Sequence, residues 1–471
     1  MPDPSRSTIV VIGAGFSGAM VTAHLLRRTW DFPVRIVLVN KSGPVARGVA
    51  YGTRQSRHVL NVPAGRMSAF PEEEDHFLRF ARERMPEVTG GSFVPRGVYG
   101  DYLGTIVTDA AARAGDDTFE SVRDEARDVR PHPDGQGAVV HLASGQVIEA
   151  DRVVLALGNY APSNPRIDDD AFYRSARYVR DPWAPGALAA VRRDHPVLLI
   201  GSGLTMLDVA LQLAEEGLSA PMLAVSRRGL TPLPHREHGA PPSYGHLPPD
   251  LVAGEPSAVA YLRAVRRHVR RLERDLIDWR EVVASLRPVT PRLWHALPDR
   301  EKSRFLRHLR PYWDVHRHRV APELWQRFDA MRRSGALAVR AARLVSMADV
   351  GDQVHASIRG RGAEAVETLR VGHVINCTGP ESDVRSLRDP LLDALLASGT
   401  VRADAMGLGL DVTDDLALVG RDGRHSRTLS LVGPLLKGTW WEATAVPELR
   451  GHAARLAARL HADLAASGVS G

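Results

Sequence analysis

The feature that most constrains the fold of this chain is a strand, a glycine-rich turn and a helix that occur together twice. The first copy, "IVVIGAGFSGAM", predicts a strand over residues 7–12, a turn over 13–18 and a helix over 19–28, and a further strand follows at 34–39. An apolar strand that passes through glycines into a helix is the opening of a βαβ unit, which begins a parallel sheet.

The second copy is "VLLIGSGLTMLDVA". It predicts a strand over 197–200, a turn over 201–203, a helix over 205–216 and a strand over 221–225. Two such openings in 471 residues predict an α/β fold with two dinucleotide-binding, Rossmann-like domains.

The rest of the pattern predicts how the chain is divided between these domains. From about residue 258 to 335 the sequence is helical in pattern and rich in arginine, and a proline-rich loop precedes it. We therefore expect a helical insertion at 240–335, within a second domain formed by residues 181–370. Residues 1–180 and 371–471 would then form a discontinuous first domain.

Composition excludes several classes of protein. The single cysteine, Cys377, leaves no Cys-x-x-Cys redox pair and no internal disulfide framework. No apolar stretch is long enough to span a membrane and no leader precedes the first strand, so we expect a cytoplasmic protein without a membrane partner. The net charge of +6 would suit an anionic ligand, but no nucleic-acid motif accompanies it, and we expect no nucleic-acid partner.

Each glycine of the first turn has its own role in holding a dinucleotide. Gly13 allows the tight turn, Gly15 lets a diphosphate approach the backbone, and Gly18 lets the helix and strand pack closely; we expect Ser17 to contact the cofactor as well. The start of the helix then presents free amides to the phosphates. At the end of the second strand, where an acidic residue usually binds the ribose, the chain has Asn40, whose amide oxygen can accept the same hydrogen bond.

The second turn differs from the first at its third glycine position, which holds Met206, so we expect the helix and strand to lie further apart there. The strand that follows ends in "SRRG". An arginine at this place suits the 2′-phosphate of NADPH. A solvated basic loop would have the same sequence pattern. We therefore expect FAD at the first turn and NADPH at the second. The residues expected to hold NADPH are Gly201, Gly203, Thr205, Ser226, Arg227 and Arg228.

Further stretches spread over most of the chain are "RGVAYGT" (47–53), "HVLNVPAGRMSAFP" (58–71), "YGDYL" (99–103), "DPW" (181–183), "LRPYWDVHRHR" (309–319) and "GTWWEATAVPELR" (438–450). With them the chain resembles bacterial FAD/NAD(P)-binding proteins and, more distantly, flavin-dependent monooxygenases that include amine N-hydroxylases. The resemblance implies that Asn61 lies beside the flavin ring as the candidate catalytic residue, although an asparagine that caps a turn before Pro63 fits the same pattern. Other cofactor contacts implied by the resemblance are Arg47, Met67, Gly158, Gly379, Gly433 and Trp440, of which Trp440 could equally belong to the core.

The resemblance implies an NADPH-dependent FAD monooxygenase. NADPH would reduce FAD, the reduced flavin would capture molecular oxygen as a peroxide adduct, and a small-molecule substrate, with an amine nitrogen as the expected nucleophile, would take one oxygen atom. Two alternatives stay open. One is an FAD-dependent NAD(P)H oxidoreductase that passes electrons to a small molecule or a partner protein, and the other is a non-catalytic flavin-binding redox sensor. A homo-oligomer is compatible with each.

We expect no metal site. His235 with His238, and His316 with His318, lack a third ligand at a workable spacing. Cys377 lies in an apolar strand, so we expect a small buried hydrophobic residue rather than a nucleophile.

Overall fold

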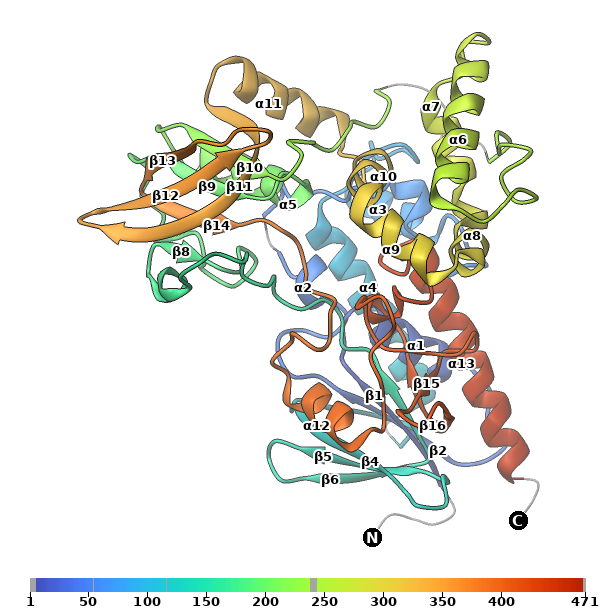
Figure 1. Cartoon of the computed structure of the whole chain (residues 1–471). Helices are drawn as coiled ribbons and strands as arrows, with labels where there is room; N and C mark the ends of the chain where they lie inside the picture. The colour runs from blue at the N-terminus through green and yellow to red at the C-terminus, as the bar shows by residue number, and fades with distance from the viewer. Residues whose placement is uncertain (1–5, 54, 116, 238–243, 469–471) are drawn as a thin grey trace. The chain divides into compact units, whose positions relative to one another are not determined.

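The computed structural model describes residues 6–53, 55–115, 117–237 and 244–468 (Figure 1). The chain divides into two compact units. Unit 1 consists of Met1–Asn159, Pro288–Asp299 and Ser382–Gly471, and unit 2 consists of Tyr160–Arg287 and Arg300–Glu381.

Unit 1 is built on a six-stranded, mainly parallel sheet. Its strands are β1 (Ser7–Ile12), β2 (Val34–Val39), β3 (Phe119–Val122), β7 (Arg152–Leu155), β15 (Ala417–Val419) and β16 (His425–Leu431). They lie in the order β15-β16-β7-β1-β2-β3, and only the β15–β16 pair is antiparallel. Ile9, Val10 and Val11 of the central strand β1 are fully buried, as expected for a parallel strand that is covered on both faces.

Helices cover this sheet, and a smaller antiparallel sheet completes the unit. α1 (Phe16–Leu26) contacts both α4 (Arg96–Ala114) and α13 (Val446–Gly468). The small sheet, in the order β4-β5-β6, packs with its first strand against α12. The remaining elements are β4 (Ala126–Pro131), β5 (Ala138–Leu142), β6 (Val147–Ala150), α2 (Gly48–Tyr51), η1 (Ala64–Arg66), α3 (His76–Arg84), α8 (Thr290–Ala296), α12 (Pro390–Ser398) and η4 (Pro434–Leu436).

Unit 2 is built on a seven-stranded sheet that is parallel on one side and antiparallel on the other. Its strands are β8 (Tyr178–Val179), β9 (Val197–Ile200), β10 (Met222–Ser226), β11 (Leu337–Val350), β12 (Gln353–Gly360), β13 (Val366–Val371) and β14 (His373–Asn376). The order is β13-β12-β11-β10-β9-β14-β8, with parallel pairs from β8 to β11 and antiparallel pairs beyond. The long strand β11 joins the two parts, because its first residues pair with β10 and its later residues pair with β12.

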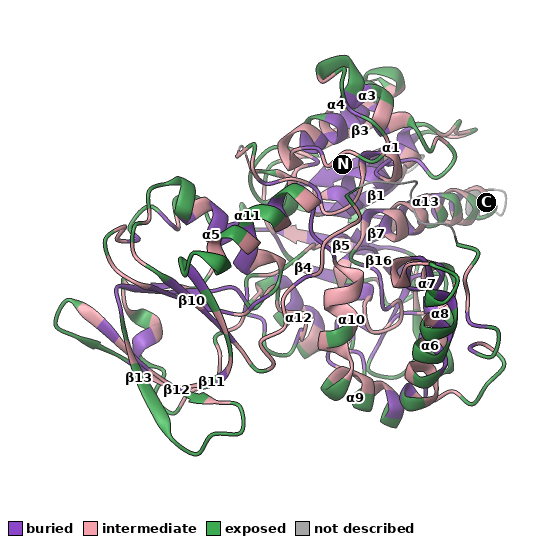
Figure 2. Ribbon diagram, turned by 90° about the horizontal axis from the view of Figure 1, so that it is seen from above, coloured by how far each residue is buried: buried purple, intermediate pink, exposed green. Residues whose placement is uncertain are grey.

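The helical stretch predicted between residues 258 and 335 is present. Its helices in unit 2 are α6 (Ala258–Glu273), α7 (Trp279–Ser285), α9 (Asp299–His308), α10 (Arg310–Arg317) and α11 (Pro322–Arg333), of which α9 begins at the unit boundary. The other helices of unit 2 are α5 (Leu204–Glu215) and η2 (Ala171–Arg174), and η3 (Arg287–Val289) crosses the boundary to unit 1. Buried residues follow the strands of both sheets, whereas exposed residues follow α6 and the β12–β13 edge (Figure 2). None of the described helices is both long and apolar enough to span a membrane.

The chain crosses from one unit to the other at different residues from those expected, which were near 180 and 370. Tyr178 of β8 pairs with Val374 of β14 in the sheet of unit 2, so both strands belong to that unit. The exchanges therefore fall after Asn159 and after Glu381. The segment Pro288–Asp299, expected within the second domain, belongs to unit 1.

Candidate functional site

The first glycine turn connects β1 to α1, and only one of its glycines leaves room beside the backbone. Gly13 has a φ of +106°, and a Cβ there would lie 2.3 Å from the carbonyl oxygen of Ala156. A Cβ on Gly18 would lie 1.8 Å from the carbonyl oxygen of Gly13. A Cβ on Gly15 would meet only the Cα of Gly48, at 4.0 Å. Packing therefore requires glycine at the first and third positions, whereas the second position is open.

The start of α1 presents backbone amides that no described side chain caps. Gly15 is the N-cap residue, and the first turn of the helix contains no acidic residue. Ser17 is buried there, and a Cβ on Gly433 would lie 3.4 Å from Ser17 Oγ, so the C-terminal segment lies directly against the turn. An uncapped helix start beside open space is the arrangement that binds a phosphate group, and it fits a dinucleotide diphosphate.

The second glycine turn, between β9 and α5, repeats this construction. Gly201 has a φ of +111°, and a Cβ there would lie 2.4 Å from the carbonyl oxygen of Cys377. Gly203 is the N-cap of α5, and no described side chain caps the helix. Within the described part of the chain, a Cβ on Gly203 would meet no atom within 4 Å other than those of its chain neighbours. Thr205 lies in the first turn of α5, and Met206 at the third glycine position is fully buried. This turn fits a diphosphate by the same test.

In each unit the strand next to the one that enters the turn ends shortly before a further glycine. β7 ends at Leu155, and Gly158 follows with a φ of +75°. β14 ends at Asn376, and Gly379 follows with a φ of +85°. Apart from its neighbours in the chain, no described residue places an atom within 4 Å of where a Cβ on either glycine would be, so backbone conformation and not crowding favours glycine here.

Asn40, predicted to bind a ribose, lies just beyond the end of β2. Its Nδ2 donates a hydrogen bond to the carbonyl oxygen of Gly43, at 2.9 Å. This contact fixes the orientation of the amide and uses its donor side. The Oδ1 atom keeps the acceptor role that a ribose hydroxyl requires.

The segment after β2 folds back onto the first turn. The backbone N–H of Ala46 donates to the carbonyl oxygen of Ala14 at 2.8 Å, and Ala46 itself is fully buried with a φ of +70°. Arg47 follows and forms an ion pair with Asp101 of α4. The predicted cofactor contact Arg47 therefore lies on a backbone segment that is anchored to the turn.

The residues at the end of β10 have three different environments. A 2.8 Å hydrogen bond joins the hydroxyls of Ser226 and Ser202, which ties the strand end to the second turn. The guanidinium of Arg228 donates to the carbonyl oxygen of Arg307, at 3.1 Å. Arg227 is exposed and makes no hydrogen bond or ion pair with the other described side chains. Of the two arginines, Arg227 is therefore the one whose guanidinium can turn to a phosphate.

Asn61 and Met67 lie on a short segment that contains the single turn of η1. Asn61 is half-buried, and Met67 is only 2% exposed. The backbone N–H of Leu60 donates to the carbonyl oxygen of Val94, at 2.9 Å, which holds the start of the segment. The role of Asn61 and Met67 at a flavin stays a prediction.

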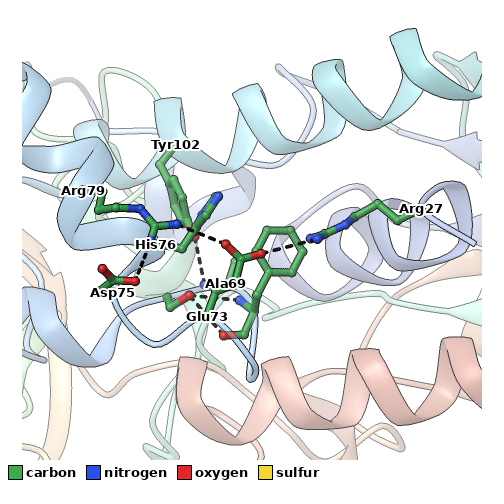
Figure 3. Close-up of polar contacts among 9 residues, drawn as sticks. Arg27, Ala69, Glu73, Asp75, His76, Arg79 and Tyr102 are labelled. Atoms are coloured by element: carbon green, nitrogen blue, oxygen red, sulfur yellow. Dashed lines mark hydrogen bonds and ion pairs between the residues drawn. The ribbon is translucent and has the colours of Figure 1, made fainter.

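Two helices hold the end of this segment, and Figure 3 shows the contact made by the first of them, through Tyr102. The hydroxyl of Tyr102, on α4, accepts a hydrogen bond from the backbone N–H of Ala69 at 3.1 Å and lies 2.7 Å from Nδ1 of His76. From α13, Arg450 donates to the carbonyl oxygen of Ser68, at 3.0 Å. Burial raises the pKa of Tyr102 to about 12 and lowers the pKa of His76. At neutral pH the phenol is therefore protonated and can donate to a neutral imidazole while it accepts from the backbone.

Ion pairs surround the same cluster. Glu73 pairs with Arg27, the residue that caps the C-terminal end of α1, at 3.4 Å and with Arg79 of α3 at 3.1 Å (Figure 3). The guanidinium of Arg27 also lies 4.1 Å from the ring centroid of Phe70. These contacts tie the segment to the helix that starts at the first glycine turn.

Trp440 lies in an aromatic and basic cluster of unit 1. Its ring is 5.3 Å from that of His295 and 5.2 Å from that of His452, and the guanidinium of Arg455 lies 5.0 Å from its centroid. Burial lowers the pKa of His452 to about 4, so this imidazole is neutral at physiological pH. The contacts are those of packed side chains, and a role for Trp440 at the flavin stays a prediction.

Three residues that lie in or near the strands and helices of the turns were not predicted from the sequence to have a role. Ser202 holds Ser226, and its position between two glycines was the available signal. Tyr99 is fully buried, with its ring stacked 6.4 Å from that of Phe16 at the start of α1. Asn376 is fully buried and donates to the carbonyl oxygen of Ser163, at 3.0 Å. The last two depend on partners far away in the sequence, which no local pattern reveals.

No metal site is found within the described part of the chain, where no group of three or more His, Cys, Asp or Glu side chains could hold an ion. His238, paired with His235 in the sequence, lies outside the described residues. Cys377 is buried as predicted, and burial raises the pKa of its thiol, which therefore stays protonated at neutral pH.

Sequence comparison characterises the first third of the chain. Residues 10–160 match a family model described as FAD-NAD(P)-binding. This segment is an FAD-NAD(P)-binding domain. It contains the first glycine turn, Asn40, Asn61 and Gly158. No curated protein matches the sequence.

Solved structures with the same fold extend over the whole chain. L-lysine 6-monooxygenase from Pseudomonas syringae has a TM-score of 0.65 at 15% identity, over 97% of this chain and 100% of that one. An ornithine N-hydroxylase from Kutzneria sp. 744, in a structure named for reduced FAD, NADP+ and L-ornithine, has a TM-score of 0.60 at 15% identity, over 96% and 98%. The bacillithiol disulfide reductase of Staphylococcus aureus has a TM-score of 0.54 at 12% identity, over 97% and 99%. The predicted α/β fold with two dinucleotide-binding domains is confirmed.

Proposed function

We propose that this chain is an NADPH-dependent FAD monooxygenase that oxygenates a small-molecule nucleophile, with an amine nitrogen as the expected acceptor. The observation that carries the proposal is the pair of glycine turns, which have the same backbone construction but different surroundings. An uncharged Asn40 follows the first, and an exposed Arg227 follows the second. The fold likeness to a lysine and an ornithine hydroxylase supports the reaction class.

In this proposal unit 1 holds FAD. The amides at the start of α1 bind its diphosphate in the space beside Gly15, and Asn40 Oδ1 accepts a hydrogen bond from the adenosine ribose. Gly433, which lies against Ser17, places the C-terminal segment beside the same cofactor. Asn61 and Met67 face the flavin end, on the segment that Tyr102 and Arg450 hold in place.

Unit 2 holds NADPH. The start of α5 binds the diphosphate beside Gly203, where no Cβ intrudes. Ser226 lies at the ribose position, and Arg227 binds the 2′-phosphate through charge-assisted hydrogen bonds. Arg228 has a structural part, because its guanidinium is bonded to the backbone of α9.

FAD, when bound, supplies the chemistry, since it accepts hydride from NADPH and passes the electrons to oxygen. The chain positions the two cofactors, keeps water from the reacting atoms and hydrogen-bonds the flavin through Asn61. Positioning the cofactors, excluding water and hydrogen-bonding the flavin do not require a separate pair of acid and base side chains.

The test uses purified protein under air. We expect a yellow protein that oxidises NADPH faster when L-lysine, L-ornithine or cadaverine is added, and that forms a hydroxylamine product in proportion. Colourless protein, reconstituted with FAD and still unable to bind it, would contradict both enzymatic interpretations. Flavin that NADPH reduces but oxygen does not reoxidise would exclude the monooxygenase.

The alternative is an oxidoreductase that passes electrons to a small molecule or a partner protein. The likeness to a disulfide reductase favours it at the level of the fold. Cys377 is the single cysteine and is buried, so the chain lacks the thiol pair for disulfide exchange, and a quinone is the better test acceptor. Anaerobic NADPH oxidation that requires the quinone would favour this alternative.

A further inference from the structure

The outward face of α6 carries a stripe of arginines that the proposed flavin chemistry does not use. The opposite face of the helix is buried through Ala264, His268 and Leu272, spaced four residues apart. The arginines repeat every three or four residues, so they share one side of the helix, and all are exposed. The stripe consists of Arg263, Arg266, Arg267, Arg270, Arg271 and Arg274, which together line an open hollow of about 610 Å³.

Acidic side chains neutralise little of the positive charge of the arginine stripe. Arg267 forms an ion pair with Asp250 at 3.6 Å, and both side chains are exposed. The other five arginines form no ion pair with any residue that the structure describes. Like charges at this spacing repel one another, so the stripe weakens the helix unless an anion binds outside it.

Exposed aliphatic residues lie at both ends of the stripe. Val259 is 39% exposed, one helical turn before Arg263 and on the same side. Leu276, just after the helix, is 94% exposed and has a φ of +59°. Glycine is the usual residue where a helix ends in this left-handed conformation, because a side chain there is strained. A leucine in that place, contributing nothing to the core, indicates an apolar contact with something outside the chain.

We propose that the outward face of α6 docks on the surface of an anionic lipid bilayer. The guanidiniums would bind lipid phosphates, and Val259 and Leu276 would enter the interface at the two ends of the helix. This contact with the membrane surface requires no spanning helix, and it revises the expectation of no membrane partner, which was based on the lack of a spanning stretch.

Size and chemistry favour a bilayer over other polyanions. The stripe is about 17 Å long, and with a helix width of about 10 Å it offers on the order of 200 Å². A stable protein–protein interface needs about 800 Å² from each partner. A nucleic acid would leave the aliphatic ends without a function, and the stripe has no aromatic side chain on which a base could stack.

The test is co-sedimentation of the full chain with vesicles of phosphatidylcholine alone and of phosphatidylcholine mixed with phosphatidylglycerol. We expect binding only to the anionic vesicles. Binding should be lost at about 1 M salt, where the Debye screening length is only about 3 Å. Each arginine near an anionic surface contributes about fivefold to affinity. Changing Arg263, Arg266 and Arg270 to glutamine should therefore weaken binding on the order of a hundredfold.

A matched control removes three charges elsewhere. Arg174, Arg333 and Arg424 are exposed and pair with nearby acidic residues outside α6. Their change to glutamine alters the net charge equally, and we expect vesicle binding to fall less than about threefold. Both variants should keep the circular dichroism of the parent, and the thermal midpoint of the stripe variant should be equal to that of the parent or higher, because three repelling charges are removed from α6.

Leu276→Gly separates docking from a structural role. Glycine relieves the strain at φ +59°, so we expect a higher thermal midpoint together with weaker vesicle binding. Unchanged binding by the triple arginine variant, equal binding to neutral vesicles, or tighter stripe-dependent binding to RNA or polyglutamate than to vesicles at the same salt would each overturn the proposal.

Discussion

Replacing Gly203 by alanine tests whether the space beside the second turn is kept for a diphosphate. The residue has φ −88° and ψ −162°, which alanine adopts without strain, and its Cβ would meet no atom of a non-adjacent described residue within 4 Å. The free energy of unfolding should therefore change by less than about 0.5 kcal/mol. The added methyl group disturbs no contact at this position that would lower stability.

The effect on the ligand should be large, because the new methyl group occupies the path by which phosphate oxygens reach the amides of α5. Losing one charge-assisted hydrogen bond costs about 1.5–3 kcal/mol, which corresponds to about a 10- to 100-fold weaker binding of NADPH. The binding of FAD, assigned to the other turn, should stay as in the parent protein. The assay is a titration of NADPH against the protein, with FAD content measured from the flavin absorbance.

Gly201→Ala is the matched change in the same turn. Its Cβ would lie 2.4 Å from the carbonyl oxygen of Cys377, at a φ of +111° that strains alanine. Strain and overpacking together should lower the free energy of unfolding by about 2–6 kcal/mol. Unchanged NADPH binding by a folded Gly203→Ala protein, or a loss of stability as large as that of Gly201→Ala, would show that the space beside Gly203 is not kept for a diphosphate.

Three further predictions concern single side chains. Arg227→Ala should raise the KM for NADPH about 30-fold, because about 2 kcal/mol of binding free energy is lost with the hydrogen bonds to the 2′-phosphate. The KM for NADH should rise less than about twofold. Equal effects on the two KM values would contradict the 2′-phosphate assignment. Asn61→Ala should release more peroxide per NADPH consumed, measured with a peroxidase assay, and unchanged coupling would count against its place at the flavin. His452, whose pKa burial lowers to about 4, is protonated first in the unfolded chain as the pH falls below 6.5, so the free energy of unfolding should drop by about 3 kcal/mol between pH 6.5 and 4. Urea unfolding of His452→Phe should show a shallower pH dependence, and identical slopes would exclude this cause.

The strands and glycine turns could be predicted from the sequence because their signals are local. The strands expected at 7–12 and 197–200 are β1 and β9 with the same bounds. The helix expected from residue 19 begins earlier, at Phe16, because Ser17 and Gly18 form its first turn. Gly18 was assigned to the turn because glycine is common in turns, but it also allows the first turn of α1 to pack closely against the backbone of Gly13.

The antiparallel part of the unit 2 sheet and the true unit boundaries were not predicted. β12 and β13 extend the sheet through β11, whose polar and apolar residues alternate only in part. Membership of a unit depends on pairing between distant strands, such as β8 with β14. Local pattern carries no information about such pairing.

At the candidate site the sequence reveals which residues can hold a dinucleotide but not what holds those residues. Contacts such as Gly13 with Ala156 and Ser17 with Gly433 join segments more than a hundred residues apart. The same limit applies to the two arginines after β10, because only the structure distinguishes the bonded Arg228 from the exposed Arg227.

The central claim is that the two turns hold different nucleotides, and a crystal structure of the protein grown with FAD and NADP+ tests it most directly. We expect the FAD diphosphate at the start of α1 beside Gly15, and the NADP+ diphosphate at the start of α5 beside Gly203, with its 2′-phosphate at Arg227. Density for the same nucleotide at both turns, or for none at either one, would contradict it.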